Sequence, residues 1–97
     1  MKAVFIVYNQ SITEMVQAIL DKLSIRGYTR WDEIKGRGTV QGEPHEGTHT
    51  WPELNNAHLV VVDDAKVEAL LEHLRILNKN IEQQGLQAFV WNIEKTL

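Results

Sequence analysis

The arrangement of this chain is decided by the stretch from Gly27 to Trp51, which reads GYTRWDEIKGRGTVQGEPHEGTHTW. Its first part alternates strand-favouring aromatic and β-branched residues with polar ones, and this pattern predicts a strand over residues 28–35. From Gly36 the composition changes, because four glycines and one proline fall within twelve residues. A backbone this rich in glycine turns or approaches something closely. In a small domain, a polar loop of this length is either disordered or functional. We therefore interpret residues 36–54 as the working loop and the two halves of the chain as its scaffold.

The segment before Gly27 has the pattern of a strand followed by a helix. Residues 3–8 are a short apolar run, as expected for a central strand. Ser11 and Glu14 have the spacing of a capping box and predict the first turn of a helix. Apolar residues then recur at helical spacing, and Gly27 is expected to end the helix as a left-handed cap. The apolar positions of this helix are Met15, Val16, Ile19, Leu20 and Leu23.

The carboxyl-terminal half repeats the same order of elements. A β-branched run predicts a strand over residues 58–63, and Asp63 or Asp64 is expected to cap the helix that follows. Residues 79–85 are polar and are expected to form a connecting loop, and residues 86–93 the last strand. The apolar stripe of the second helix consists of Val67, Leu70, Leu71, Leu74 and Leu77.

The resulting βαββαβ order predicts an α+β, ferredoxin-like fold, in which a four-stranded antiparallel sheet carries both helices on one face. The other face then has no cover within the chain. Phe89 and Trp91 alternate with Ala88 and Val90, so both faces of the last strand are apolar. An apolar sheet face is most simply covered by further copies of the chain. The sequence therefore predicts an oligomer in which sheets meet.

Size and composition exclude several classes of protein. The 97 residues suit a single domain over 1–97, and 10 Lys and Arg against 13 Asp and Glu give a net charge of -3 without any block of like charges. A chain with this net charge and no basic cluster is not expected to bind nucleic acid or an anionic membrane. The chain lacks cysteine, which excludes disulfides and thiolate chemistry. No apolar run is long enough to span a membrane or to serve as a signal peptide, and we expect a cytoplasmic protein.

The residues around the proposed loop resemble those of the nitrogen-regulatory PII signalling proteins. Residues 27–29, Gly-Tyr-Thr, are similar to a Gly-x-Thr of that family, and residues 33–38, Glu-Ile-Lys-Gly-Arg-Gly, with Gly42 are similar to the run that precedes its long loop. Residues 61–64, Val-Val-Asp-Asp, look like the family's turn into its second helix. The resemblance covers essentially the whole chain and implies a homotrimer that binds adenine nucleotides in clefts between subunits. It also implies a regulatory protein, not an enzyme, whose loop contacts a partner enzyme, transporter or regulator.

The resemblance further implies which residues contact the nucleotide. The start of the second strand would lie near the base, and the glycine-rich backbone after it would approach the phosphates, since glycine amides form anion-binding nests. Two cations flank these glycines, so an anion site and two solvated side chains at a strand end both remain open. Residues 78–85 keep little of the family's second glycine-rich loop, which is a departure from its pattern. The implied ligand-binding residues are Gly27 and Thr29 near the base, and Lys35, Gly36, Arg37 and Gly38 near the phosphates.

The loop also contains a candidate metal site, which leads to an alternative hypothesis. His45 and His49 have His-x-x-x-His spacing with Glu46 between them, and nitrogen and oxygen ligands of this kind suit zinc, copper or nickel. Pro44 and Gly47 argue against a helix, so solvated loop histidines are the competing interpretation. On the metal hypothesis the chain is a trimer closer in role to the copper-tolerance CutA proteins, which share this fold.

Trp51 and Glu43 are the candidate contacts between the loop and a partner protein. The competing interpretation is that Trp51 anchors the loop on the protein itself, given the large area that a tryptophan buries. Trp31 is expected to be core, in either the helix-facing or the barrel-facing register. His58 and His73 are expected to be structural or solvated. No catalytic motif is recognisable, so the leading hypothesis is a sensor of a small effector that regulates a partner through its loop.

Overall fold

The structure is a computed structural model, which describes residues 1–36, 54–81 and 85–97. Its helices and strands follow one another in the predicted order. They are β1 (Lys2–Asn9), the short 3-10 helix η1 (Gln10–Ile12), α1 (Thr13–Lys22), β2 (Thr29–Ile34), β3 (Asn55–Val62), α2 (Asp64–Asn80) and β4 (Gln87–Asn92).

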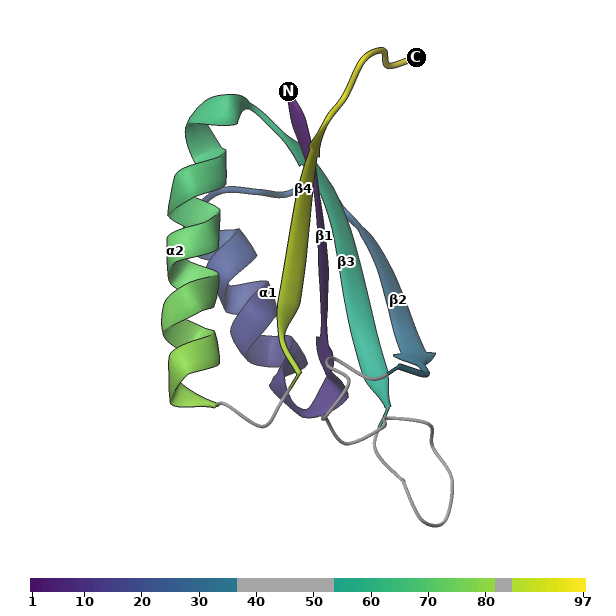
Figure 1. The fold of residues 1–97 in the computed structure, drawn as a ribbon, viewed down its shortest axis with the longest axis vertical. Coiled ribbons are helices and arrows are strands. Elements are labelled where there is room, and N and C mark those ends of the chain that lie inside the picture. Colours follow the sequence, from purple (N-terminus) through teal and green to yellow (C-terminus); the bar gives the residue numbers. More distant parts are fainter. Residues whose placement is uncertain (37–53, 82–84) are drawn as a thin grey trace.

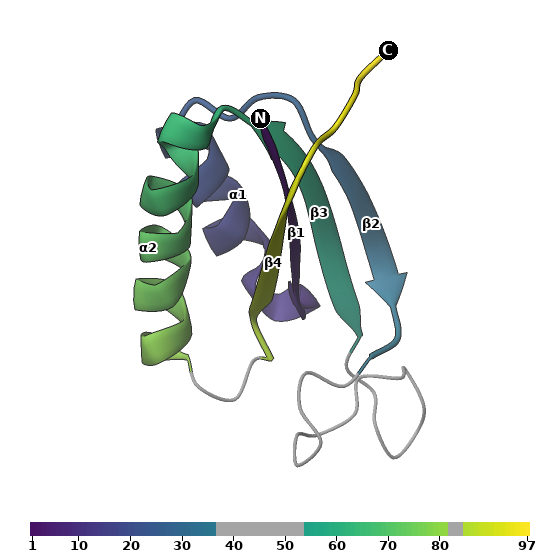
Figure 2. The same ribbon diagram turned by 45° about the horizontal axis from the view of Figure 1, so that its top comes forward.

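The four strands form one antiparallel sheet in the order β2-β3-β1-β4. The strands β1 and β3 are central, and β2 and β4 are the two edges. Both α1 and α2 pack on the same face of this sheet, while the opposite face carries no helix of the described part of the chain (Figures 1 and 2). This arrangement confirms the predicted ferredoxin-like fold.

The hydrophobic core lies between the sheet and the two helices. Side chains alternate along a strand, so every second residue of β1 and of β3 faces the helices. Burial of this apolar surface, at about 25 cal/mol per Å², holds the helices on the sheet. The fully buried members are Val4, Ile6 and Tyr8 of β1, Val60 of β3, Val16 and Leu20 of α1, and Leu70 of α2.

The open face of the sheet is apolar as well. Phe5 is paired with Phe89 and Ala3 with Trp91, so these side chains share the face away from the helices. Trp31 lies on the same face, and its ring meets Phe5 edge-to-face with 6.1 Å between the ring centroids. The side chains of Phe89, Trp91 and Trp31 are 54%, 48% and 42% exposed. Trp31 is thus not part of the core of this chain, and of the two expected registers it takes the one directed away from the helices.

The start of α1 differs from the prediction. The helix is preceded by η1, in which the Asn9 side chain accepts a hydrogen bond from the Ser11 amide at 2.8 Å. Ile12 is the residue before α1, and it makes no side-chain cap. The predicted capping box of Ser11 and Glu14 is therefore wrong, because the chain uses Asn9 to turn out of β1 before α1 begins.

The end of α1 also differs from the prediction. The residue with a left-handed backbone is Ser24, with a φ of 58°, and Gly27 is not left-handed. Lys66 of α2 donates to the carbonyls of Leu23 and Ser24 at 3.1 and 3.3 Å. The amides of Ser24 and Ile25 donate to the carbonyls of Asp21 and Leu20 at 3.1 and 2.8 Å, so the backbone around Ser24 closes the end of α1, and Lys66 binds two carbonyls just beyond it. The prediction of Gly27 as the cap is therefore wrong.

The helix α2 follows Asp63 as predicted, but its two aspartates do not act as expected. Asp63 precedes the helix in an extended conformation and makes no side-chain capping bond. Asp64 pairs with the amino group of Met1 at 2.8 Å, and this hydrogen bond lowers the pKa of its carboxyl. The helix continues to Asn80, into the predicted loop, and β3 starts at Asn55, earlier than predicted.

Candidate functional site

The candidate site is built where β2 ends and β3 begins, on either side of residues 37–53. Gly36 lies directly against Asn55, and a Cβ atom added to Gly36 would lie 2.8 Å from Asn55 Nδ2. Real Cβ contacts are not this short, so any other residue at position 36 requires one of the two groups to move. Asn55 is buried, which limits that movement. Glycine is therefore needed here for a close approach of the backbone to a packed side chain.

A bulge in β2 precedes Gly36. The pairing of β2 with β3 changes register between Trp31 and Ile34, and within this interval Glu33 has a left-handed φ of 58°. This conformation is unfavourable for a residue with a side chain. Asn56 stabilises it, because the Oδ1 of Asn56 accepts a hydrogen bond from the Glu33 amide at 2.9 Å. Sequence reasoning missed this pair, and nothing in the local sequence marks a glutamate for a left-handed conformation.

Asn56 and Gln10 attach the same region to the start of α1. The Nδ2 of Asn56 donates to Thr13 Oγ1 at 2.8 Å, and that hydroxyl donates to the Gln10 carbonyl at 2.6 Å. The Gln10 amide donates to the Leu54 carbonyl at 2.9 Å. The segments on both sides of residues 37–53 are therefore held at one place, which we call the loop base and define as residues 33–36 and 54–56.

His58 is fully buried close to the loop base. The Tyr8 hydroxyl lies 2.8 Å from His58 Nδ1, and Gln17 Oε1 lies 3.2 Å from His58 Nε2. A neutral imidazole with its proton on Nε2 satisfies both contacts, since Tyr8 then donates and Gln17 accepts. Tyr28 meets the imidazole edge-to-face with 5.1 Å between the ring centroids. Of the two expected roles for His58, the structure therefore shows the structural one.

Burial sets the protonation of this cluster. It raises the pKa of Tyr8 to about 12. Burial also lowers the pKa of His58, and the positive charge of Arg30 lowers it further. Both side chains are therefore uncharged near neutral pH. The cluster stabilises the packing between α1 and the sheet and is not arranged for acid–base chemistry.

A polar cavity of about 450 Å³ opens beside the cluster, with a lining that includes Gln10, Thr13 and Arg30. The guanidinium of Arg30 is bound to Asp32 by hydrogen bonds of 2.6 and 3.3 Å, which raise the pKa of Arg30. Among the residues that the structure describes, every buried side-chain polar atom has a partner. The cavity therefore presents no buried group that needs a ligand to satisfy it.

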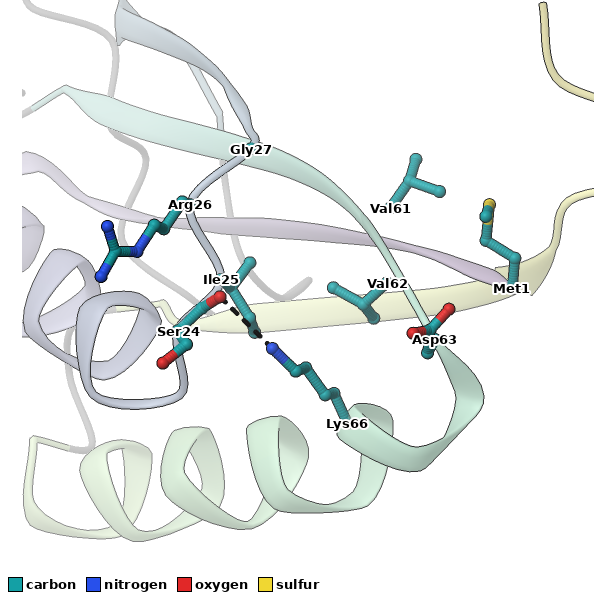
Figure 3. Close-up of a pocket in the computed structure, with 9 residues that line it drawn as sticks. All are labelled: Met1, Ser24, Ile25, Arg26, Gly27, Val61, Val62, Asp63 and Lys66. Carbon is teal, nitrogen blue, oxygen red and sulfur yellow. Dashed lines mark hydrogen bonds between the residues drawn. The ribbon is translucent and has the colours of Figure 1, made fainter.

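A second cavity, of about 360 Å³, lies where the chain leads into β2, and Gly27 borders it (Figure 3). A Cβ atom added to Gly27 would meet nothing within 4 Å. Lys66 reaches across toward Ser24, while the Arg26 side chain points away from Lys66 (Figure 3). The cavity leaves room for a ligand group beside Gly27.

Within one chain, the predicted ligand-binding residues form two separate groups. Gly27 and Thr29 lie at the start of β2, whereas Lys35 and Gly36 follow its end. Thr29 and Ile34 are the first and last residues of this strand, and five steps of strand span about 16 Å. One chain therefore does not bring the implied base-contacting and phosphate-contacting residues together.

The other predicted site residues fall in the part of the chain that the structure does not describe. Within residues 1–36, 54–81 and 85–97, no three His, Cys, Asp or Glu side chains are grouped as a metal site requires. In the same residues, no helix is long and apolar enough to cross a membrane. The predicted residues outside these ranges are Arg37, Gly38, Glu43, His45, Glu46, His49 and Trp51.

The fold is similar to that of CPII, a nitrogen regulatory PII-like protein from Thiomonas intermedia K12. The structure of CPII bound to ADP and bicarbonate has a TM-score of 0.76 at 23% identity, with 95% of this chain and 84% of that chain covered. A structure of CPII bound to ADP, AMP and bicarbonate has a TM-score of 0.75 at 22% identity, with 95% and 90% covered. The apo form of CPII has a TM-score of 0.72 at 20% identity, with 95% and 87% covered. At these identities the likeness shows the fold.

The family follows from the sequence as a whole. Comparison with curated proteins by sequence gave no match. In contrast, the sequence profile described as "Nitrogen regulatory protein P-II" matches residues 1–97. The resemblance that was noted around the loop is therefore confirmed over the full length, and the chain belongs to the nitrogen regulatory protein P-II family.

Proposed function

We propose that this protein is a PII-like signalling protein of the cytoplasm, which senses an adenine nucleotide and regulates a partner protein through its 36–54 loop. The observation that carries the proposal is the match of residues 1–97 to the P-II family. The CPII structures bound to ADP, AMP and bicarbonate indicate which small molecules to test first. The proposed protein regulates its partner and is not itself an enzyme, in keeping with the name of the family.

The proposed assembly is a homotrimer in which the open sheet faces meet. The half-exposed rings of Trp31, Phe89 and Trp91 give each chain an apolar face that a monomer leaves in water. The strands β2 and β4 are edges of the sheet, and unpaired edges favour association. Copies of the same chain cover this face without any further partner.

The separation of the ligand-binding groups along β2 supports a site between subunits. Gly27 and Thr29 precede or begin the strand and Gly36 follows it, so these groups of one chain lie at opposite ends of the strand. A ring of identical subunits provides both groups from neighbouring chains. In this arrangement the base lies beside Gly27 and Thr29 of one subunit, and the phosphates lie beside Lys35 and Gly36 of the next.

The proposed regulation is a shift in population. Phosphates bound by amides near Gly36 stabilise one arrangement of the 36–54 loop over others. The partner then contacts that arrangement through Trp51 and Glu43. The nucleotide shifts the equilibrium only by the difference between its affinities for the two arrangements.

Titration calorimetry with ATP, ADP and AMP, with and without bicarbonate, tests the proposal on the full chain. Arg37→Ala is expected to weaken nucleotide binding by about tenfold, because a cation near the phosphates is lost. Arg75→Ala is the matched control, since Arg75 is exposed on α2 and pairs with Glu72 at 3.4 Å. If the unchanged protein binds none of the three nucleotides, nucleotide sensing is wrong. Equal affinities of the two variants would contradict the placement of the phosphates.

The CutA-like metal hypothesis has no support from the comparisons, and its ligands lie outside the described residues. It stays a prediction with its own measurement, which is zinc and copper binding by equilibrium dialysis. Uptake of one metal ion per chain that is lost in the His45→Ala/His49→Ala variant would establish it, and retention of nucleotide affinity in that variant would show that the two sites are separate.

A further inference from the structure

One buried side chain, Asn56 at the start of β3, connects β2 to α1. Its Oδ1 accepts a hydrogen bond from the Glu33 amide at 2.9 Å, and its Nδ2 donates to Thr13 Oγ1 at 2.8 Å. The Thr13 hydroxyl gives its proton to the Gln10 carbonyl, so it can only accept from Asn56. If the carboxamide of Asn56 were rotated by half a turn, its Nδ2 would face the Glu33 N–H, and two donors would meet. The two partners therefore fix both the position and the orientation of the Asn56 side chain.

The contact with Glu33 falls on a residue whose backbone conformation is unfavourable. Its φ of 58° is readily adopted by glycine but not by glutamate. Residues in such conformations persist where the surrounding structure determines them strongly. The hydrogen bond from the Glu33 amide to Asn56 is an interaction of this kind, and it is shielded from water because Asn56 is 5% exposed.

The residues that follow Glu33 are the described part of the proposed phosphate site. Lys35 and Gly36 come two and three residues later, so a change of φ at Glu33 redirects both of them relative to β3. Gly36 already lies close to β3, since a Cβ atom added to it would be 2.8 Å from Asn55 Nδ2. The position of the phosphate site therefore depends on the conformation of Glu33.

We propose that Asn56 is a positioning residue for the nucleotide site. By holding Glu33 in its left-handed conformation, Asn56 places Lys35 and Gly36 where they meet the phosphates, and its bond to Thr13 ties this placement to the start of α1. The identity of the ligand rests on the proposed function, whereas the placement of Lys35 and Gly36 rests on the contacts of this chain.

The test compares three variants of the full chain. Asn56→Ala removes both hydrogen bonds. Val67→Ala is the control for a general loss of stability, since Val67 is also buried but lies in the first turns of α2, which follows the other end of β3. In the double variant Asn56→Ala/Glu33→Gly, a glycine adopts the left-handed conformation without help from Asn56.

In Asn56→Ala we expect the Glu33 amide to exchange with solvent about tenfold faster than in Val67→Ala, measured by hydrogen exchange with NMR detection. The amide resonances of Lys35 and Gly36 are expected to shift in Asn56→Ala only. The dissociation constant for ADP is expected to rise about tenfold in Asn56→Ala and to return to within about threefold of the original in the double variant. Such a rescue follows from positioning through Glu33, and a merely structural role of Asn56 does not produce it.

Three results would overturn the inference. The first is an unchanged exchange rate of the Glu33 amide in Asn56→Ala. The second is an equal affinity of Asn56→Ala and Val67→Ala for ADP, and the third is a double variant that binds ADP no better than Asn56→Ala. If the unchanged protein binds ATP or AMP but not ADP, the affinities are compared with the nucleotide that binds. If it binds none of the three nucleotides, the proposed function fails on its own, and the exchange rate of the Glu33 amide and the resonances of Lys35 and Gly36 still decide the positioning.

Discussion

On the helix-covered face of the sheet, Ile6 and Val60 are fully buried within one chain, whereas on the opposite face Phe89 is 54% exposed and Trp91 is 48% exposed. Both faces carry large apolar side chains, and they differ in that α1 and α2 cover only the first (Figure 2). Burial on the covered face stabilises the single chain, while the apolar area of the open face is available for association. The two faces should therefore respond differently to the same kind of substitution.

The largest effect is expected from a charge on the open face. Phe89→Asp is expected to abolish the proposed homotrimer at micromolar concentrations, because a carboxylate would lie unpaired in an apolar interface. Ile76→Asp is the matched control, since Ile76 is on α2 and has the same exposure of 54% as Phe89. Sedimentation velocity measures both. If the unchanged protein sediments as a monomer, or if both variants dissociate to the same extent, the expected role of the open face in association is contradicted.

The covered face is expected to show the next largest effect, on folding. Leu70→Ala removes a fully buried side chain of α2 and is expected to lower the free energy of unfolding by about 2–5 kcal/mol. Val61→Ala on the open face, where Val61 is 46% exposed, is expected to lower it by less than about 1 kcal/mol when measured in the Phe89→Asp background. Urea titrations give both values. Similar losses at the two positions would show that the single chain depends on both faces.

Most of the fold could be predicted from the sequence, because periods of 2 and 3.6 residues distinguish strands from helices without knowledge of tertiary contacts. The ends of elements could not be predicted in this way. Gly27 has the properties of a helix cap, yet Ser24 takes the left-handed conformation, in which the amides of Ser24 and Ile25 donate to carbonyls of the last turn of α1. Lys66, 42 positions further along the chain, then donates to the Ser24 carbonyl. Asn55 and Asn56 disfavour a strand by propensity, and β3 nevertheless includes both of them.

The candidate site, too, has features that could be predicted from the sequence and features that could not. Gly36 could be singled out because a glycine in such a stretch indicates a close approach of the backbone, and the structure shows one with Asn55. The conformation of Glu33 and its bond to Asn56 could not be predicted, since they depend on pairing between β2 and a residue 23 positions away. The residues between positions 37 and 53 lie outside the described ranges, and their roles in binding remain predictions.

His58 is a buried titratable side chain on the covered face, and it should make the stability of that face depend on pH. Its pKa is lowered in the folded chain by burial, so below about pH 6.5 the unfolded chain binds a proton that the folded chain does not. Stability is therefore complete above that pH and falls as the pH falls toward the folded pKa, by at most about 1.4 kcal/mol per pH unit. Unfolding in urea between pH 8 and pH 5 measures this loss.

His58→Gln is expected to reduce the pH dependence, and His73→Gln is the control. The ring of His73 is bonded to the Ala69 carbonyl at 2.8 Å on the surface of α2, away from the covered face. An equal pH dependence in His58→Gln and in the unchanged protein would show that His58 is not the group responsible. A loss that appears as the pH rises, and not as it falls, would contradict the direction of the pKa shift.

The smallest effect is expected from a change of backbone preference that alters neither face. Glu33 and Ser24 are the described non-glycine residues with positive φ, and both have a φ of 58°. Glycine removes the steric cost of about 1–2 kcal/mol at such a position, but it also makes the unfolded chain more flexible by about 0.5–1 kcal/mol. Glu33→Gly and Ser24→Gly are therefore each expected to stabilise the chain by about 0.5–1 kcal/mol in urea titrations, with the oligomeric state unchanged. If Glu33→Gly destabilises the chain while Ser24→Gly does not, the glutamate side chain makes a contact that offsets its backbone cost, and the loop base then depends on Glu33 itself as well as on Asn56.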